Sequence, residues 1–420
     1  MKFKLKVFGC LINEDDGKKV SKLMARFSNF EKTSSINSAD LIIILMCSAT
    51  KEVYDEALEW IEENKNDKDL ILTGCIVESD KKDLSKKFKG VEIIDIKNVS
   101  KWKDKINSMK RVSSQISTPR DVDFQIEEKV QIMRGCNNFC SYCVIPYIKG
   151  REESKDLNEI ITTVDRYIKN GVKEIWLLGQ NVLAYKDADK NNFIKLLDEI
   201  DKINGNFWIK FHTSHPKDFD NEIIDVIKKS KKISQYLKLP IQSGSDKILN
   251  RMNRGYTTKE YLDKLNNAKE KLPNLSIVTD IIVGFPGETE KDFLDTVKVV
   301  KEINPIGSVV NIYSPRPKTK AAEMKNQIPK KIKDHRLSEI KTKLDKIAKK
   351  RVSQEVGKEA VFLAKGFKDG HLIGTTKNNL NMIVKGRKNQ VGEFIKVEVI
   401  DFFDPNKNVI IFSLIGKQLT

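Results

Sequence analysis

The chain has 420 residues, of which 39% are hydrophobic and 32% charged, as is typical of a globular protein with two or three domains. Its 76 Lys and Arg residues outnumber its 59 Asp and Glu residues, and the net charge of +17 predicts a polyanionic partner such as nucleic acid. A uniformly lysine-rich proteome is the alternative explanation. The longest apolar run, Leu41 to Cys47, is far shorter than the roughly 20 residues that cross a bilayer, and the N-terminus lacks an apolar signal core. We therefore expect a cytoplasmic protein without a membrane partner, whose six cysteines bind metal rather than form disulfides.

Residues 1–118 alternate between strand-like and helical stretches, and a cysteine follows each of three predicted strands. The strands are 3–8, 40–46 and 69–73, and the cysteines are Cys10, Cys47 and Cys75. In a parallel sheet the carboxyl ends of the strands lie along one edge, where ligand sites form. We therefore expect the three thiols to meet there and bind a metal cluster. One such cysteine alone would be an ordinary small core residue.

Residues 112–124 have linker character, and the chain after them contains a second group of cysteines. Cys136, Cys140 and Cys143 lie on a loop rich in Gly, Asn and Ser. Three thiolates at this spacing can hold three irons of a 4Fe–4S cluster and leave the fourth iron open to a substrate or cofactor. A zinc site would need a fourth Cys or His nearby, and the flanking sequence has none. Inert buried thiols are the other alternative, which the loop composition disfavours.

Between residues 125 and 350, six strand-like runs alternate with helical ones. The strands fall at 130–133, 174–178, 208–212, 236–239, 276–283 and 308–313, and the helices at 155–170, 191–203, 218–230, 258–271 and 290–302. This order predicts a parallel α/β barrel or an open parallel sheet. His212 and His215 follow the third strand. We expect loop histidines with structural hydrogen bonds there, and proton carriers or ligands are the alternative.

A basic amphipathic helix is predicted from Lys325 to Arg351. Its apolar stripe consists of Leu337, Ile340, Leu344 and Ile347. The other faces carry many basic residues, including Lys333 and Arg336, and form either a solvated surface or a face that follows phosphates. Five short strand-like runs then predict a small closed β-barrel. They lie at 359–364, 371–374, 382–385, 394–400 and 409–414.

The loop Cys-x-x-x-Cys-x-aromatic-Cys, with Tyr142 as the aromatic residue, resembles the signature of radical S-adenosylmethionine (SAM) enzymes. In that family the open iron chelates the amino and carboxylate groups of SAM. An electron from the cluster, which an external donor must supply, cleaves SAM into methionine and a 5′-deoxyadenosyl radical. The resemblance also implies a partial six-unit barrel with the site on its top face.

The loop and the N-terminal cysteines together resemble the methylthiotransferases, whose N-terminal domain binds an auxiliary 4Fe–4S cluster. The opening Gly9-Cys10-Leu-Ile-Asn13-Glu-Asp-Asp16 is similar to their Gly-Cys-x-x-Asn-x-x-Asp, and Gly74-Cys75 is similar to their third ligand. Leu45-Met46 precedes Cys47, where the family commonly has Asn-Thr. The resemblance implies two 4Fe–4S clusters, held by Cys10, Cys47 and Cys75 and by Cys136, Cys140 and Cys143.

Three segments after barrel strands resemble edges that touch SAM in this family. They are Gly179-Gln-Asn181, Gln242-Ser-Gly-Ser245 and Asp280–Glu288. The resemblance implies cofactor contacts from Tyr142, Gln180, Asn181 and Gln242. Residues of these types serve tight turns equally well.

The resemblance covers nearly the whole chain and implies three domains. They are an auxiliary-cluster domain (1–118), a radical SAM domain with the basic helix (125–350) and an RNA-binding TRAM barrel (352–420). The implied reaction inserts sulfur into an unactivated C–H bond and methylates it. No side chain removes such a hydrogen as a proton at neutral pH, so the cofactor must supply radical chemistry.

The family has three substrate branches. Two act on the adenosine just 3′ of the tRNA anticodon, and this adenosine carries an isopentenyl group in one branch and a threonylcarbamoyl group in the other. The third branch acts on an aspartate of a ribosomal protein. The segment Tyr313–Ala322 with Gln327-Ile-Pro329 resembles the archaeal and eukaryotic threonylcarbamoyl branch, from which Lys318 and Lys320 depart. We therefore expect a monomeric enzyme that converts N6-threonylcarbamoyladenosine in the anticodon loop of tRNA into its 2-methylthio derivative. The alternatives are the other two substrates, or a non-catalytic Fe–S protein that binds RNA and senses redox state. A sensor would gain nothing from an open iron.

Overall fold

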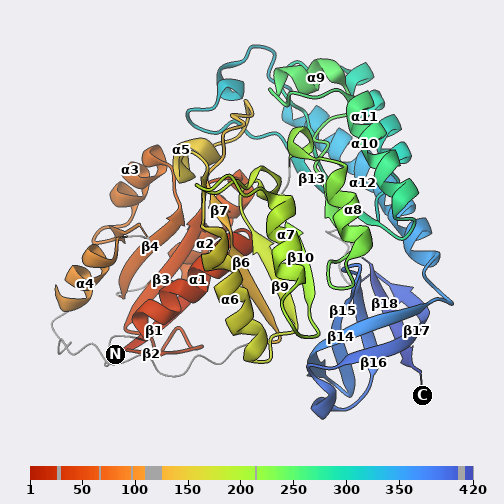
Figure 1. The fold of residues 1–420 in the computed structure, drawn as a ribbon. Helices are drawn as coiled ribbons and strands as arrows, with labels where there is room; N and C mark the ends of the chain where they lie inside the picture. Colours follow the sequence, from red (N-terminus) through yellow and green to blue (C-terminus); the bar gives the residue numbers. More distant parts are fainter. Residues whose placement is uncertain are drawn as a thin grey trace.

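The structure is a computed structural model that describes residues 1–25, 30–65, 68–95, 98–108, 125–212, 215–404 and 412–419. Three units follow one another along the chain (Figure 1): a parallel sheet with helices (red to orange), an α/β barrel (yellow to cyan) and a closed β-barrel (blue). The linker predicted at 112–124 lies outside the described residues. Of the described helices, none combines the length and the hydropathy needed to cross a bilayer.

The N-terminal unit is a five-stranded parallel sheet in the order β2-β1-β3-β4-β5. Its strands are β1 (Lys2–Val7), β2 (Glu31–Lys32), β3 (Leu41–Cys47), β4 (Asp69–Cys75) and β5 (Glu92–Ile93). Its helices are α1 (Leu11–Met24), α2 (Lys51–Asn64), α3 (Glu78–Lys87) and α4 (Val99–Ser108). Every residue of β3 is buried, because this central strand is covered on both faces, and this explains its uninterrupted apolar sequence.

The middle unit confirms the predicted fold class of six parallel strands that alternate with helices. The strands form two sheets, β6-β9-β10 and β11-β12-β13, which meet through a bridge between Ile209 and Ile233. They are β6 (Glu127–Gln131), β9 (Glu174–Leu178), β10 (Trp208–His212), β11 (Tyr236–Lys238), β12 (Ser276–Val283) and β13 (Gly307–Ile312). The helices between them are α6 (Leu157–Lys169), α7 (Phe193–Asp201), α8 (Glu222–Lys229), α9 (Asp246–Arg251), α10 (Thr258–Lys271) and α11 (Glu290–Ile303). A small hairpin, β7 (Met133–Arg134) with β8 (Glu153–Ser154), and α5 (Ile145–Lys149) flank the cysteine loop.

Helix α12 (Lys330–Ser353) joins the barrel to the C-terminal unit and begins later than predicted. Pro329 stands at its N-cap, since proline cannot continue a helix from within. Ile340 and Leu344 are buried as predicted. Lys333 and Arg336, however, are buried rather than on an exposed basic face, and the prediction was wrong for them. The physical reason is that acceptors on the barrel lie opposite them: the Tyr313 carbonyl accepts from Lys333 at 2.8 Å, and Glu288 pairs with Arg336 at 2.7 Å.

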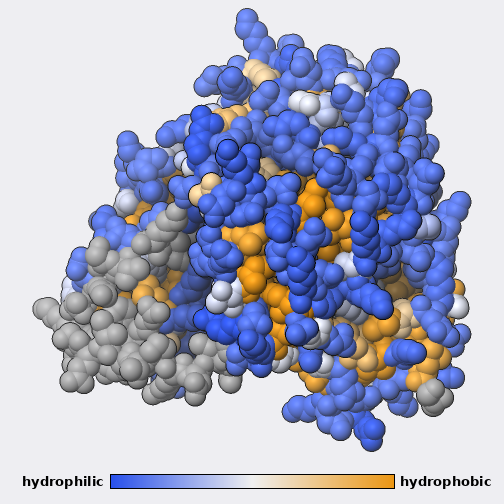
Figure 2. Space-filling model, viewed as in Figure 1, coloured by the Kyte–Doolittle hydropathy of each residue, from blue (hydrophilic) through white to orange (hydrophobic). Residues whose placement is uncertain are grey.

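The C-terminal unit confirms the predicted five-stranded closed barrel, in the order β14-β15-β16-β18-β17. Its strands are β14 (Glu359–Lys368), β15 (His371–Thr376), β16 (Asn381–Lys385), β17 (Phe394–Phe403) and β18 (Ser413–Gln418). The last strand begins later than predicted, and residues 409–411 of the predicted run lie outside the described chain. One hydrophobic core runs from the α/β barrel through α12 into this unit. The surface in Figure 2 is largely hydrophilic, with apolar side chains gathered over the two barrels.

Candidate iron–sulfur and cofactor site

The three N-terminal thiols lie at the carboxyl edge of the parallel sheet. Cys47 and Cys75 end β3 and β4 as direct neighbours in register, on strands about 4.8 Å apart. A hydrogen bond between these buried thiols lowers the pKa of Cys47 and raises that of Cys75. Cys10 precedes α1 and is exposed. Gly9 brings Cys10 close to Cys47, because a Cβ at this glycine, whose φ is +114°, would lie 2.8 Å from the Cys47 Cβ.

Asn13 connects the strand ends around these thiols. Its side chain is buried, and Nδ2 donates to the Phe8 carbonyl at 2.8 Å and to the Met46 carbonyl at 3.0 Å. The Cys75 thiol donates to its Oδ1 at 3.1 Å. Because Asn13 bonds the backbone of Met46, the departure at Leu45-Met46 leaves this hydrogen bond in place.

The second cysteine loop is fixed at its two ends. Gly135 has a φ of +78°, and a Cβ there would lie 1.9 Å from the Arg151 carbonyl oxygen, so only glycine fits. The Cys136 N–H donates to the Gly150 carbonyl at 3.2 Å. The loop is thus closed against the residues that follow α5.

Cys140 has a buried cation as its neighbour. Arg254 Nη1 donates to the Cys140 Sγ at 3.3 Å, and Arg254 is 4% exposed. His215 Nε2 lies 3.9 Å from the same sulfur, and its Nδ1 accepts a hydrogen bond from the Lys217 N–H. Burial lowers the pKa of His215 to about 2, so the ring is neutral. Burial also raises the pKa of Cys143 to about 12, so this thiol must lose a proton when it binds iron.

Helix α1, which follows Cys10, packs the N-terminal unit against the barrel that carries the second cysteine loop. Leu11 and Ile12 pack against Trp176 and Tyr236 of the barrel strands. Ion pairs and hydrogen bonds from α1 to β6 hold this contact: Lys18–Glu128 at 2.9 Å, Lys19–Gln131 at 2.9 Å and Lys129–Glu14 at 2.5 Å. The carboxyl edge of the N-terminal sheet therefore faces the barrel.

The residues predicted to contact the cofactor have two kinds of environment. Tyr142 lies beside the loop, where its hydroxyl accepts from Arg254 at 3.4 Å. Gln242 has a φ of +68°, and its side chain makes no hydrogen bond to any residue that the structure describes. Both can face a ligand.

Gln180 and Asn181 are instead engaged with the protein. Gln180 Oε1 accepts from the Gly135 N–H at 2.7 Å, and so holds the cysteine loop. Asn181 Nδ2 donates to Asp218 at 2.6 Å, and its Oδ1 accepts from the His215 N–H at 3.0 Å. Direct contact with a cofactor remains a prediction for both.

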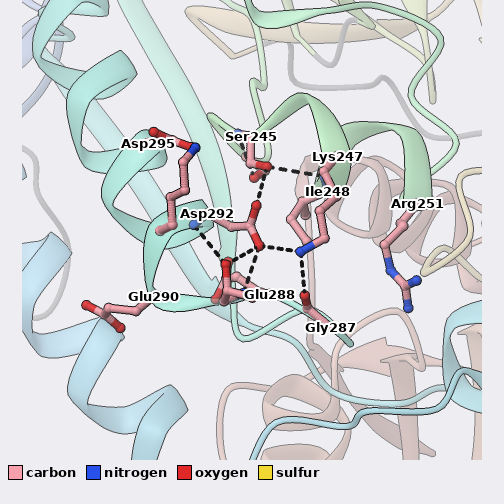
Figure 3. A network of polar contacts seen from close by, with 12 residues as sticks. Ser245, Lys247, Ile248, Arg251, Gly287, Glu288, Glu290, Asp292 and Asp295 are labelled. Carbon is pink, nitrogen blue, oxygen red and sulfur yellow. Dashed lines mark hydrogen bonds and ion pairs between the residues drawn. The ribbon is translucent and has the colours of Figure 1, made fainter.

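A polar network fixes two of the predicted cofactor edges to each other (Figure 3). Asp292 accepts from Ser245 at 2.7 Å and from Lys247 at 2.8 Å. Arg251 donates to the Pro286 carbonyl at 3.1 Å. Arg336 of α12 pairs with Glu288 at 2.7 Å, which is why this arginine is buried. Asp292 therefore anchors the segment that ends at Ser245, and Arg251 and Arg336 anchor the segment that ends at Glu288.

A cavity of about 190 Å³ lies between the α/β barrel and the closed β-barrel. His212, Tyr236, Lys238 and Ser308 line it from one side, and Asn378–Asn381 from the other. His212 Nδ1 and Ser308 Oγ have no hydrogen-bond partner among the described residues. Burial lowers the pKa of His212 to about 3, so it is neutral. Such unpaired polar atoms are costly unless a ligand or water satisfies them.

The donor sets fit clusters better than single metal ions. Within the described residues, no three His, Cys, Asp or Glu side chains converge on a point that could hold one ion. The thiolates of a 4Fe–4S cluster bind different irons and are spaced more widely. Sequence reasoning missed Arg254 and also Lys149, which lies among the N-terminal thiols. Neither has a local sequence signal, because each acts on cysteines distant along the chain.

Comparisons with known proteins agree with this arrangement. Residues 130–300 match the Radical SAM superfamily, and residues 2–95 match an uncharacterized protein family, UPF0004. The structure of TsrM, a radical S-adenosylmethionine methyltransferase from Kitasatospora setae, superimposes with a TM-score of 0.51 at 12% identity, over 76% of this chain and 74% of that one. At this identity the likeness concerns the fold alone.

Two curated relatives are similar over nearly their full length. The tRNA-2-methylthio-N(6)-dimethylallyladenosine synthase of Fusobacterium nucleatum is 36% identical over 93% of this chain and 95% of its own. The enzyme of the same name from Natranaerobius thermophilus is 35% identical over 95% and 94%. These names favour the isopentenyl (dimethylallyl) alternative over the threonylcarbamoyl substrate expected from the sequence. The chain belongs to the radical SAM methylthiotransferases, a family of enzymes that use two 4Fe–4S clusters and SAM.

Proposed function

We propose that this methylthiotransferase acts on tRNA and adds a methylthio group to carbon 2 of the N6-dimethylallyladenosine beside the anticodon. The names of relatives that are 36% and 35% identical support both the tRNA and the dimethylallyl group. The net charge of +17 suits an RNA substrate. The threonylcarbamoyl substrate becomes the second candidate.

The observation that carries the proposal is the arrangement of two thiol sets, one at the sheet edge and one on the loop, on units packed against each other. We assign Cys10, Cys47 and Cys75 to the auxiliary cluster, and Cys136, Cys140 and Cys143 to the cluster that binds SAM. The bound cluster and SAM supply the radical chemistry. The chain's own residues hold the two centres in one chamber and exclude water from it.

The three domains expected from the sequence take separate roles in this proposal. Residues 1–118 present the auxiliary cluster, residues 125–350 bind SAM, and the closed barrel at 352–420 contacts the anticodon arm. An external donor supplies the electron, and the chain works as a monomer.

The cavity between the two barrels supports the second candidate. Its wall contains Lys238, the neutral His212 and the unpaired hydroxyl of Ser308. The carboxylate and hydroxyl of a threonylcarbamoyl group could form hydrogen bonds with these polar side chains. A dimethylallyl group has no polar atoms and would leave them without a partner.

The test compares two anticodon stem-loop RNAs that differ only in the N6 group of the target adenosine. The protein is reconstituted anaerobically and given SAM, sulfide and dithionite, and the nucleosides are analysed by mass spectrometry. Methylthiolation of the dimethylallyl RNA alone supports the proposal, and methylthiolation of the threonylcarbamoyl RNA alone supports the second candidate. Formation of 5′-deoxyadenosine without modification of either RNA would contradict both.

A further inference from the structure

Lys149 lies at the end of α5, directly after the cysteine loop, and its backbone position is tied to that loop. The carbonyl of the next residue, Gly150, accepts the hydrogen bond from the Cys136 N–H. Pro146 within the first turn of α5 further restricts this short helix. The position of Lys149 therefore follows that of the SAM-side thiols.

The side chain of Lys149, however, enters the N-terminal unit. Its ammonium lies 3.4 Å from Asp16 Oδ2 of α1, and the two side chains are 2% and 3% exposed. Asn13, one turn earlier on the same helix, accepts a hydrogen bond from the Cys75 thiol at 3.1 Å. The Lys149 ammonium therefore lies close enough to the Cys75 thiol to interact with it. Its positive charge acts on Cys10 and Cys47 as well. One buried cation of the SAM unit is thus placed among all three thiols of the other set.

Lys149 is one of several residues that dock the two units. The three polar contacts between α1 and β6 and the packing of Ile12 against Trp176 also hold the units together. A buried ammonium is costly unless it is paired, and Asp16 is the carboxylate that pairs with Lys149 here. The position of this ammonium close to the auxiliary thiols therefore allows a second role besides docking.

We propose that Lys149 is a positioning residue that donates a hydrogen bond to the Cys75 sulfur of the auxiliary cluster and makes the reduction potential of that cluster less negative. Net charge and hydrogen bonds to sulfur set the potential of an Fe–S centre, and a cation favours the more negative reduced state. The same contact fixes the auxiliary sulfurs relative to the SAM-side loop. The inference rests on the proposed assignment of the six cysteines, but it does not depend on which RNA is the substrate.

The test measures the auxiliary cluster by itself in the full chain, in the C136A/C140A/C143A background. Potentials come from redox titrations followed by electron paramagnetic resonance, with iron content measured in parallel. Lys149→Met removes the charge and keeps the length, and Lys149→Arg keeps the charge. Lys129→Met is the matched control, because it removes an ion pair with Glu14 across the same interface, away from the thiols.

We expect about four irons per chain in every variant, since one 4Fe–4S cluster is present. The potential should shift to a more negative value in K149M, and stay near that of the background in K149R and K129M. An unchanged potential in K149M, or equal shifts in K149M and K129M, would overturn the proposal. Loss of iron in K149M and K149R alike would also overturn it, because Lys149 would then be structural, whereas rescue by K149R would support it. A chain that never binds auxiliary iron would instead refute the cysteine assignment in the proposed function.

Discussion

A buried charge network connects the α/β barrel to the C-terminal barrel and allows a quantitative prediction. Glu174 and Lys210 pair at 2.8 Å, and both side chains are 0% exposed. Lys365 of β14 reaches the same carboxylate at 2.5 Å. Thr375 and Asn379, also of the C-terminal barrel, accept from Lys210 at 3.1 and 3.0 Å.

Glu174→Gln should lower the free energy of unfolding more than Lys210→Met does. In Glu174→Gln, Lys210 stays buried beside Lys365 without a carboxylate between them, and removing one partner of a buried pair costs about 3–5 kcal/mol. In Lys210→Met, Glu174 keeps Lys365 and the indole N–H of Trp176, so we expect a loss of about 1–3 kcal/mol. The double variant removes both charges together and should lose at least about 1 kcal/mol less than the sum of the two.

Urea unfolding followed by tryptophan fluorescence measures these values, because Trp176 and Trp208 lie 5.5 and 5.6 Å from the Lys210 ammonium. Burial lowers the pKa of Lys210 to about 8, and E174Q should lower it further. Folded E174Q then binds fewer protons than its unfolded chain. The difference in free energy of unfolding between E174Q and the native chain should therefore shrink as the pH rises from about 7 to 8. Additive losses, or a deficit in E174Q below about 0.5 kcal/mol, would refute this reasoning.

Three further predictions concern the site. Gly135→Ala should abolish iron binding on the loop, because the Cβ would meet the Arg151 carbonyl. Gly366→Ala, in the C-terminal barrel with open space and no positive φ, should retain iron binding in the same iron assays. Arg254→Met should reduce the yield of 5′-deoxyadenosine at least about tenfold, because a hydrogen bond to a charged group contributes about 1.5–3 kcal/mol, and Arg254→Lys should restore part of the yield. Burial opposes ionisation of Asp292, but its hydrogen bonds outweigh burial and hold its pKa well below the usual value. Asp292→Asn should therefore be less stable than the native chain at pH 7, and that difference should narrow below about pH 4 in unfolding experiments.

The sequence was sufficient for the fold because its local signals agree with the final packing. The strands at 174–178, 208–212 and 276–283 have the predicted bounds, and most of their residues are buried in the barrel. The cysteines at the ends of two parallel strands also followed from topology, because neighbouring strands bring Cys47 and Cys75 into register.

Long-range polar contacts could not be predicted in this way. From the sequence, Arg336 is one more basic residue on an exposed helix face. It is buried because the fold places Glu288 opposite it, and the two side chains form an ion pair. The sequence predicts a cofactor contact for Asn181, but in the structure its side chain forms hydrogen bonds with Asp218 and with the backbone N–H of His215. Lys149 resembles any surface lysine until α1 brings Asp16 to it.

The central claim is that two sets of three cysteines hold two separate 4Fe–4S clusters, and iron counting with Mössbauer spectroscopy tests it most directly. Anaerobically reconstituted native protein should contain about eight irons per chain, and about four should remain in C10A/C47A/C75A and in C136A/C140A/C143A. About four irons in the native chain, with no loss in C10A/C47A/C75A, would contradict the account.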